Sequence, residues 1–275
     1  MTKKTATIIL NRNLPDVADG LYEAIHKHNA EMTDIYVVES GSDKDKLSEY
    51  CSWWANWDDA MRDGLRVPRG VNYALSQLLK EGKFYDYDYF LMMTNDAEFE
   101  DKPVVNVLVE VMEEHPHVGI LAPCSRQWGE ADLLGPDNTK YFWYVHNVAY
   151  MMRREYIESI MEREKPTYMN FLYDGTNFRG YGLEMELVAK GYANDWASAI
   201  TTRVWVEENE EHLKTKVDLI KTEPLEVIER EYVEEGRRWM MRKYGFKSHW
   251  SMQMFAKLFY EKFFEFYPEL EKYRI

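Results

Sequence analysis

The segment 86–99, DYDYFLMMTNDAEF, constrains the fold of this chain more than any other stretch. Residues 87–93 form an apolar and aromatic run that has the length of one buried strand. The run leads, without a glycine or proline turn, to Asp96 and Glu98. A carboxylate just past the carboxyl end of a buried strand lies where open α/β sheets bind their ligands. The segment therefore predicts an α/β sheet with a ligand site at this strand end.

Two interpretations of this strand end are open. If the chain stays extended, Asp96 and Glu98 point the same way, because side chains alternate along a strand. Two carboxylates so placed offer the hard oxygen ligands that suit Mg²⁺ or Mn²⁺. In the alternative interpretation, the strand ends in a polar turn, and Asn95 and Asp96 cap the next helix.

The rest of the chain alternates short apolar runs with helical patterns, as expected for a mostly parallel sheet covered by helices. Strands are expected at 5–10, 34–39, 118–122, 141–152 and 199–206. Helices are expected at 17–25, around Leu47 and Tyr50, and at 72–79, 103–114, 153–161 and 183–190, the last capped by Gly191. Residues 125–140 are typical of a mobile surface loop.

The chain becomes helical from residue 223 onward, with helices expected at 227–244 and 249–266. The second of these is aromatic or apolar on most faces, through Phe255, Leu258, Phe259, Phe263, Phe264 and Phe266. Such a helix must pack on the main domain or on another subunit, so a homo-oligomer is one expectation. We expect one domain at 1–215 and a helical extension at 216–275.

Cysteine content and hydropathy indicate the cellular compartment of the protein. Cys51 and Cys124 are the two cysteines among 275 residues, which makes neither a disulfide framework nor a zinc site. A reducing compartment fits this usage. The basic segment MTKKTATIIL has too short an apolar run for a signal peptide, and no stretch approaches the ~18 apolar residues of a membrane span. The sequence predicts a cytoplasmic protein without a transmembrane segment.

The formal net charge of −14 argues against general binding of nucleic acid, which needs a basic surface. We therefore expect no measurable binding to unmodified duplex DNA at physiological salt. A gel shift at sub-micromolar protein checks this expectation, and a shift that weakens steeply with added salt would contradict it.

Four short segments accompany the central strand end in a defined order. They are 10–13 after the first strand, 39–43 (ESGSD) after the second, 69–72 (RGVN) at a helix start, and 182–186 (GLEME) at a later one. With Thr94-Asn95-Asp96 and the basic pair 153–154, this order resembles the family-2 glycosyltransferases, which have the GT-A fold. The likeness covers about residues 5–215. It implies a nucleotide-sugar donor, a hydroxyl-bearing acceptor, and Mn²⁺ or Mg²⁺.

The resemblance also implies which residues serve the donor and the metal. Donor binding falls to residues at strand ends and at one helix start: Asn11, Arg12, Glu39, Arg69, Asn72, Asn95 and Asp96. Asp96 and His212 would hold the metal ion, which stabilises the charge on the departing nucleoside diphosphate. As alternatives, Glu39 is a surface carboxylate, His212 is a solvated side chain of an acidic loop, and the arginines form surface salt bridges.

The resemblance gives Glu184 the role of general base, which takes the proton of the acceptor hydroxyl. One base without a covalent intermediate implies inversion at the anomeric carbon. We expect the helix N-terminus to keep Glu184 ionised at neutral pH. The alternative is that Glu184 and Glu186 are simply first-turn acids favoured by the helix dipole.

Two groups of aromatic residues either line a sugar or base pocket or pack in the core. They are Trp53, Trp54 and Trp57 near the sheet edge, and Trp128, Trp143 and His146 on the expected acceptor side.

Two rival functions compete with a glycosyltransferase. A sugar-nucleotide pyrophosphorylase would want a glycine-rich, basic phosphate loop after the first strand, and residues 11–16 contain neither glycine nor lysine. A non-catalytic module that binds carbohydrate or protein is favoured by Thr94, which stands where the family's metal motif has its first acid.

Overall fold

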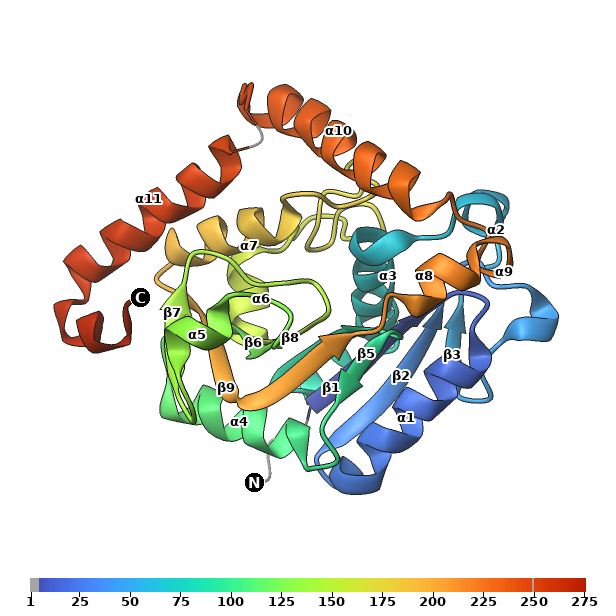
Figure 1. Ribbon diagram of the computed structural model, residues 1–275, viewed down its shortest axis with the longest axis horizontal. Helices are drawn as coiled ribbons and strands as arrows, with labels where there is room; N and C mark the ends of the chain where they lie inside the picture. The colour runs from blue at the N-terminus through green and yellow to red at the C-terminus, as the bar shows by residue number, and fades with distance from the viewer. Residues whose placement is uncertain (1–4, 249) are drawn as a thin grey trace.

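The computed structural model describes residues 5–248 and 250–275. A nine-stranded sheet has the order β3-β2-β1-β4-β8-β6-β9-β5, with β7 beside β9 (Figure 1). The strands are β1 (Thr5–Asn11), β2 (Thr33–Glu39), β3 (Cys51–Trp54), β4 (Tyr89–Thr94), β5 (Ala97–Phe99), β6 (Val118–Cys124), β7 (Thr139–Phe142), β8 (Ala149–Arg153) and β9 (Ala197–Glu208). Strands β3, β2, β1 and β4 are parallel, and β8 runs antiparallel between β4 and β6. The expected α/β fold class is confirmed.

The register of the parallel strands brings their carboxyl ends to one level. Leu10 of β1 pairs with Thr94 of β4, and Asn11 pairs with Glu39 of β2. Every residue of β1 is buried, as expected for a central strand covered on both faces. The polar residues that follow β1, β2 and β4 therefore meet at one edge of the sheet.

Helices cover both faces of the sheet. Helices α1 (Pro15–Asn29) and α4 (Val104–Glu114) lie side by side on one face, and α3 (Arg66–Lys80), α6 (Arg154–Ile160) and α7 (Leu183–Tyr192) lie on the other (Figure 1). The shorter helices are α2 (Asp58–Asp63), α5 (Glu130–Leu134), α8 (Glu211–Thr215) and α9 (Val217–Ile220), and 3₁₀ turns cover Lys44–Lys46, Phe84–Asp86 and Pro268–Tyr273.

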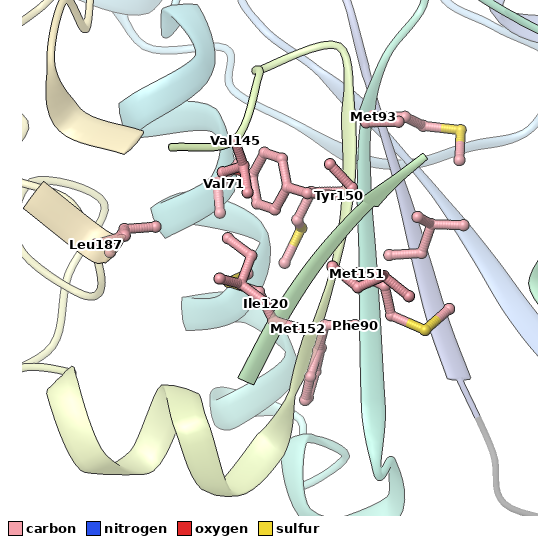
Figure 2. Close-up of a cluster of buried hydrophobic side chains, with 14 of the residues drawn as sticks. Val71, Phe90, Met93, Ile120, Val145, Tyr150, Met151, Met152 and Leu187 are labelled. Carbon is pink, nitrogen blue, oxygen red and sulfur yellow. The ribbon is translucent and has the colours of Figure 1, made fainter. Parts of the chain in front are cut away.

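The core forms where these helices meet alternating strand residues. Figure 2 shows Tyr150 and Met152 of β8 on the side of α3, whereas Met151 points to the opposite face. Val71 of α3 and Leu187 of α7 enter the same cluster, and all five side chains are buried. Because side chains alternate along the strand, β8 contributes to the core on both faces of the sheet.

Helices α10 (Leu225–Tyr244) and α11 (Ser251–Phe266) form two sides of an inverted V over the domain (Figure 1). Helix α11 packs against α7 through buried Met252, Tyr260 and Phe263, so the aromatic helix does pack on the main body. Its outer face leaves Met254 and Leu258 more than half exposed. His249, expected at the start of this helix, lies outside the described residues, and the division at residue 215 stays a prediction.

Several expected elements are corrected by the structure. The run 141–152 is not one strand, because β7 pairs with β9 whereas β8 pairs with β4 and β6. The helix expected around Leu47 is a single 3₁₀ turn, since the Ser48 N–H donates to Glu39 instead of continuing a helix. Gly191 lies inside α7 and does not cap it. The expected loop 125–140 contains α5 and the start of β7.

Among the described residues, no helix combines the length and the apolar character that crossing a membrane requires.

Candidate active site

A chain of hydrogen bonds joins the carboxyl ends of β4, β1 and β2. Asn95 Nδ2 donates to Asn11 Oδ1 at 2.7 Å, and Asn11 Nδ2 donates to both Glu39 oxygens at 3.0 and 3.1 Å. Glu39 is fully buried, and the Ser42 hydroxyl and the Ser48 N–H also donate to it. The structure thus brings together three residues assigned to the donor. It uses the Glu39 oxygens to fix the turn after β2, so Glu39 is not a surface carboxylate.

The chain turns at Asn95 and Asp96, where the Asn95 N–H donates to the Leu10 carbonyl at 3.1 Å. Of the two open interpretations, the extended chain with Asp96 and Glu98 on one strand does not hold, because Asp96 lies in the turn before β5. Both side chains nevertheless line one cavity of about 490 Å³ together with His212. Asp96 Oδ1 and His212 Nδ1 are buried and, within the described chain, have no hydrogen-bond partner.

A second cavity of about 630 Å³ adjoins the first through Glu98 and Asn209, which line both. Trp128 and the acidic end of β9 form its other walls. Burial, together with the charges of Asp96 and Glu210, raises the pKa of Glu208 to about 7. The Trp128 ring and several carboxylates therefore line the two cavities beside the turn at Asp96.

The donor atoms at Asp96 and His212 fit a divalent cation. Burial raises the pKa of the Asp96 carboxyl, although the Thr94 hydroxyl and His212 act in the opposite direction. A cation would compensate this buried, unpartnered oxygen. No three His, Cys, Asp or Glu side chains within the described ranges are grouped to hold an ion. Mg²⁺ is commonly held by one or two carboxylates while phosphates and water complete its shell, so two protein ligands suffice.

Glu184 lies in the first turn of α7, two residues after Gly182, which has a left-handed backbone (φ +81°). Its side chain is buried, and in the described chain Oε2 has no hydrogen-bond partner. Burial raises the pKa of Glu184 to about 7, against smaller opposing effects of its own backbone and of Asn147. Desolvation therefore opposes the helix N-terminus, which was expected to keep Glu184 ionised at neutral pH.

Tyr232 of α10 packs against the loop that leads into α7, a contact that sequence reasoning missed. Burial raises the pKa of Tyr232 well above its usual value, and the charges of Glu184 and Glu208 add to the effect. Its ring packs edge-on against Tyr181, with centroids 5.1 Å apart. Tyr232 therefore lies within electrostatic reach of both carboxylates. Its helix was assigned to the extension beyond the catalytic domain, so no sequence signal connected it to the site.

Glu186 and Asn72 hold the chain segments around the site in place. Glu186 is buried, accepts a hydrogen bond from the Tyr244 hydroxyl, and pairs with Lys243 Nζ at 2.8 Å. It therefore ties α7 to α10. Asn72 is fully buried and donates to the Tyr173 carbonyl at 2.8 Å while accepting from the Tyr173 N–H. It holds the loop 168–173 against α3.

The two arginines assigned to the donor are held by carbonyl groups. Arg12 Nη2 donates to the Met61 and Arg62 carbonyls at 3.3 and 3.0 Å. Arg69 Nε donates to the Gly175 carbonyl at 2.8 Å. In the described structure backbone carbonyl groups hold both guanidinium groups, so the alternative of a surface salt bridge does not describe them.

The aromatic residues divide between core and cavity. Trp53 is buried and stacks on Tyr36 with ring centroids 4.6 Å apart. Trp57 lines a separate cavity of about 390 Å³. Trp128 lines the 630 Å³ cavity and packs on the buried His146 at 5.6 Å.

No protein-family model matches the chain, and no curated protein sequence matches it. The mannosyltransferase PcManGT from Pyrobaculum calidifontis, in complex with GDP-Man and Mn²⁺, is similar with a TM-score of 0.54 at 10% identity, over 95% of this chain and 75% of that one. Glucosyl-3-phosphoglycerate synthase from Mycobacterium tuberculosis, in complex with Mn²⁺, UDP and glucosyl-3-phosphoglycerate, gives 0.51 at 12% identity, over 90% and 81%.

A third solved structure, GalNAc-T7 with UDP, GalNAc and Mn²⁺, gives a TM-score of 0.57 at 9% identity, over 95% of this chain and 56% of that chain. Likeness at such low identity establishes the fold alone. The sheet order, the helices on both faces and these similarities together show that the chain has the GT-A fold.

Proposed function

We propose that the protein is a metal-dependent, inverting glycosyltransferase of the family-2 type, which moves a sugar from a nucleotide-sugar donor to a hydroxyl acceptor. One observation carries the proposal. Asp96 Oδ1 and His212 Nδ1 are buried and unpartnered in the described chain, and their side chains line one cavity at the end of β4 of a GT-A fold. Mn²⁺ or Mg²⁺ bound there would balance the charge of the donor diphosphate.

In this proposal the chain's own residues position the substrates and move the proton. The Asn95–Asn11–Glu39 hydrogen bonds set the three strand ends before any ligand arrives. Arg12 and Arg69 are further donor-binding candidates, and Asn72 serves the donor side by holding the loop 168–173 against α3. Glu184 Oε2, which has no partner among the described residues, takes the acceptor proton. A pKa of about 7 suits a base that works near neutral pH.

A thermal-shift panel of nucleotide sugars, with and without Mn²⁺, tests the proposal. The correct donor should raise the melting temperature only with metal, since a ligand at 100 times its Kd stabilises the folded state by about 2.7 kcal/mol. A panel in which no nucleotide sugar shifts the melting temperature would argue against the function.

A non-catalytic carbohydrate- or protein-binding module is the second candidate, favoured by Thr94 in place of an acid. The Thr94 hydroxyl donates to the Val148 carbonyl at 3.4 Å. Donor hydrolysis with Mn²⁺ separates the two functions, since a binding module holds the donor without cleaving it. The cytoplasmic location and a homo-oligomer through the outer face of α11 remain predictions.

A further inference from the structure

Four arginines converge on one place outside the Asp96 cavity, and we call them the arginine cluster: Arg12, Arg66, Arg69 and Arg179. Three of them surround the Phe178 ring, whose centroid lies 4.6 Å from the guanidinium carbon of Arg69, 5.7 Å from that of Arg66 and 5.9 Å from that of Arg179. Burial lowers the pKa of Arg12, and the neighbouring positive charge of Arg66 lowers it further. A chain of net charge −14 thus brings four guanidinium groups close together here.

Two carboxylates face the centre of the cluster. Arg179 Nη1 pairs with Glu235 of α10 at 3.0 Å, and its Nη2 contacts Glu223. Arg66 Nη2 pairs with the other Glu223 oxygen at 2.8 Å. The charges of Asp63, Asp43 and Glu223 act on the pKa of Arg12 in the opposite direction to burial and Arg66. Glu223 thus bridges two guanidinium groups, as one phosphate group would.

The cluster keeps unused donors. The Nε atoms of Arg12, Arg66 and Arg179 are buried and have no hydrogen-bond partner in the described chain. A buried charged donor without a partner is costly, so such groups mark places where a ligand can bind. The planar guanidinium fork matches the oxygens of phosphate and carboxylate, which makes an anion the fitting ligand.

The segment that carries Glu223, residues 217–223, lies across the turn after β1, and we call it the strap. Asn13 Nδ2 donates to the Leu219 carbonyl at 2.8 Å, and Lys221 Nζ pairs with Asp43. Asn13, Arg66 and Lys221 all have left-handed backbones, with φ of 56°, 53° and 56°. Such conformations are costly outside glycine and gather at ligand clamps and switches. Here three of them occur where the strap meets the domain.

We propose that the arginine cluster binds a phosphate group of a substrate, and that Glu223 of the strap occupies this site until the substrate displaces it. The inference rests on the proposed function, since the phosphate belongs either to the donor diphosphate or to a phosphorylated acceptor. The Glu223 carboxylate is the internal stand-in for that phosphate.

Calorimetry with inorganic pyrophosphate as the probe tests the site. Arg66→Gln and Arg179→Gln should each weaken binding about tenfold or more, because each removes a charged hydrogen-bond donor. Glu223→Gln should tighten binding several-fold, because it removes the competing carboxylate. A damaged fold cannot produce tighter binding, so this variant separates the site from a structural role. Arg203→Gln, whose arginine pairs with Glu110 and Glu114 of α4, is the matched control and should bind as the wild type does.

Two further titrations distinguish the source of the phosphate. If it belongs to the donor, Arg66→Gln weakens binding of a nucleoside diphosphate and leaves glycerol phosphate binding unchanged. If it belongs to the acceptor, Arg66→Gln weakens glycerol phosphate binding measured with the nucleoside diphosphate site saturated. Either result supports the cluster as a phosphate site.

Unchanged pyrophosphate affinity in Arg66→Gln, Arg179→Gln and Glu223→Gln would overturn the inference. It would leave the proposed function standing if Mn²⁺-dependent donor binding still requires Asp96. Loss of Asp96-dependent donor binding with an intact phosphate response would instead overturn the proposed function alone.

Discussion

Glu184→Gln is expected to lower turnover about 10²–10⁴-fold, the usual contribution of a general base, while donor affinity stays at the wild-type value. Glutamine keeps the size of the side chain but cannot accept the proton of the acceptor hydroxyl. A turnover assay beside a donor titration measures both quantities. Wild-type turnover in the variant, or a loss of donor binding instead, would remove Glu184 from the role of base.

The pH dependence of the wild type gives an independent readout. A base must be ionised, and burial raises the pKa of Glu184 to about 7, so turnover should fall as the pH drops below about 7. The raised pKa also affects stability. The neutral carboxyl contributes stability below its usual pKa of 4.5, and this contribution is lost as the pH rises through about 7. Glu184→Gln should therefore gain melting temperature relative to the wild type as the pH rises.

Glu186→Gln is the matched control, two residues along the same helix. Glu186 is buried against Lys243 and Tyr244, so the variant should lose melting temperature and keep most of its turnover. The opposite signs of the two stability changes separate a base from a structural carboxylate.

Asp96→Ala is expected to abolish Mn²⁺-dependent binding of a nucleoside diphosphate while the protein stays folded. Asp96 Oδ1 has no hydrogen-bond partner in the described chain, so its removal breaks no hydrogen bond of that oxygen. Removing a buried, unpartnered carboxylate also relieves a desolvation cost. Calorimetry with and without Mn²⁺ gives the affinity, and thermal unfolding gives the stability.

Asp101→Asn provides the control for this second variant. Asp101 is an exposed carboxylate that pairs with Lys27 at 2.8 Å, and its loss should leave metal-dependent binding unchanged. Unchanged affinity and unchanged metal dependence in Asp96→Ala would mean that the cation, if one binds, is held elsewhere.

The sequence was informative where a strong local pattern decides the structure. The apolar run before Asp96 predicted β4, and the order of short motifs predicted the GT-A sheet, because strand period and strand ends are local properties. Only the structure shows that Asp96 Oδ1 and His212 Nδ1 are buried without a hydrogen-bond partner in the described chain. Their residue types suggested a metal, but whether a neighbour satisfies a buried atom depends on tertiary packing.

Long-range contacts explain what the sequence left out. Tyr232 and Glu223 lie far along the chain from Glu184 and Arg66, and no periodicity links such positions. The pKa of Glu184 was predicted from its helix terminus alone, whereas burial by neighbouring segments decided it. Arg66 carried no signal, since a lone arginine at a helix start is common on protein surfaces.

The strap has a consequence for how the protein is made. Asn13 and Leu219, which it joins, are 206 positions apart, and the Lys221–Asp43 pair spans 178 positions. The ribosome adds about 5–20 residues per second, and N-terminal segments fold first. The turn after β1 therefore emerges from the ribosome tens of seconds at most before the strap that closes over it. Arg179 precedes Glu223 by 44 positions, so at this rate the four arginines of the cluster are all present only a few seconds before the carboxylate that bridges two of them.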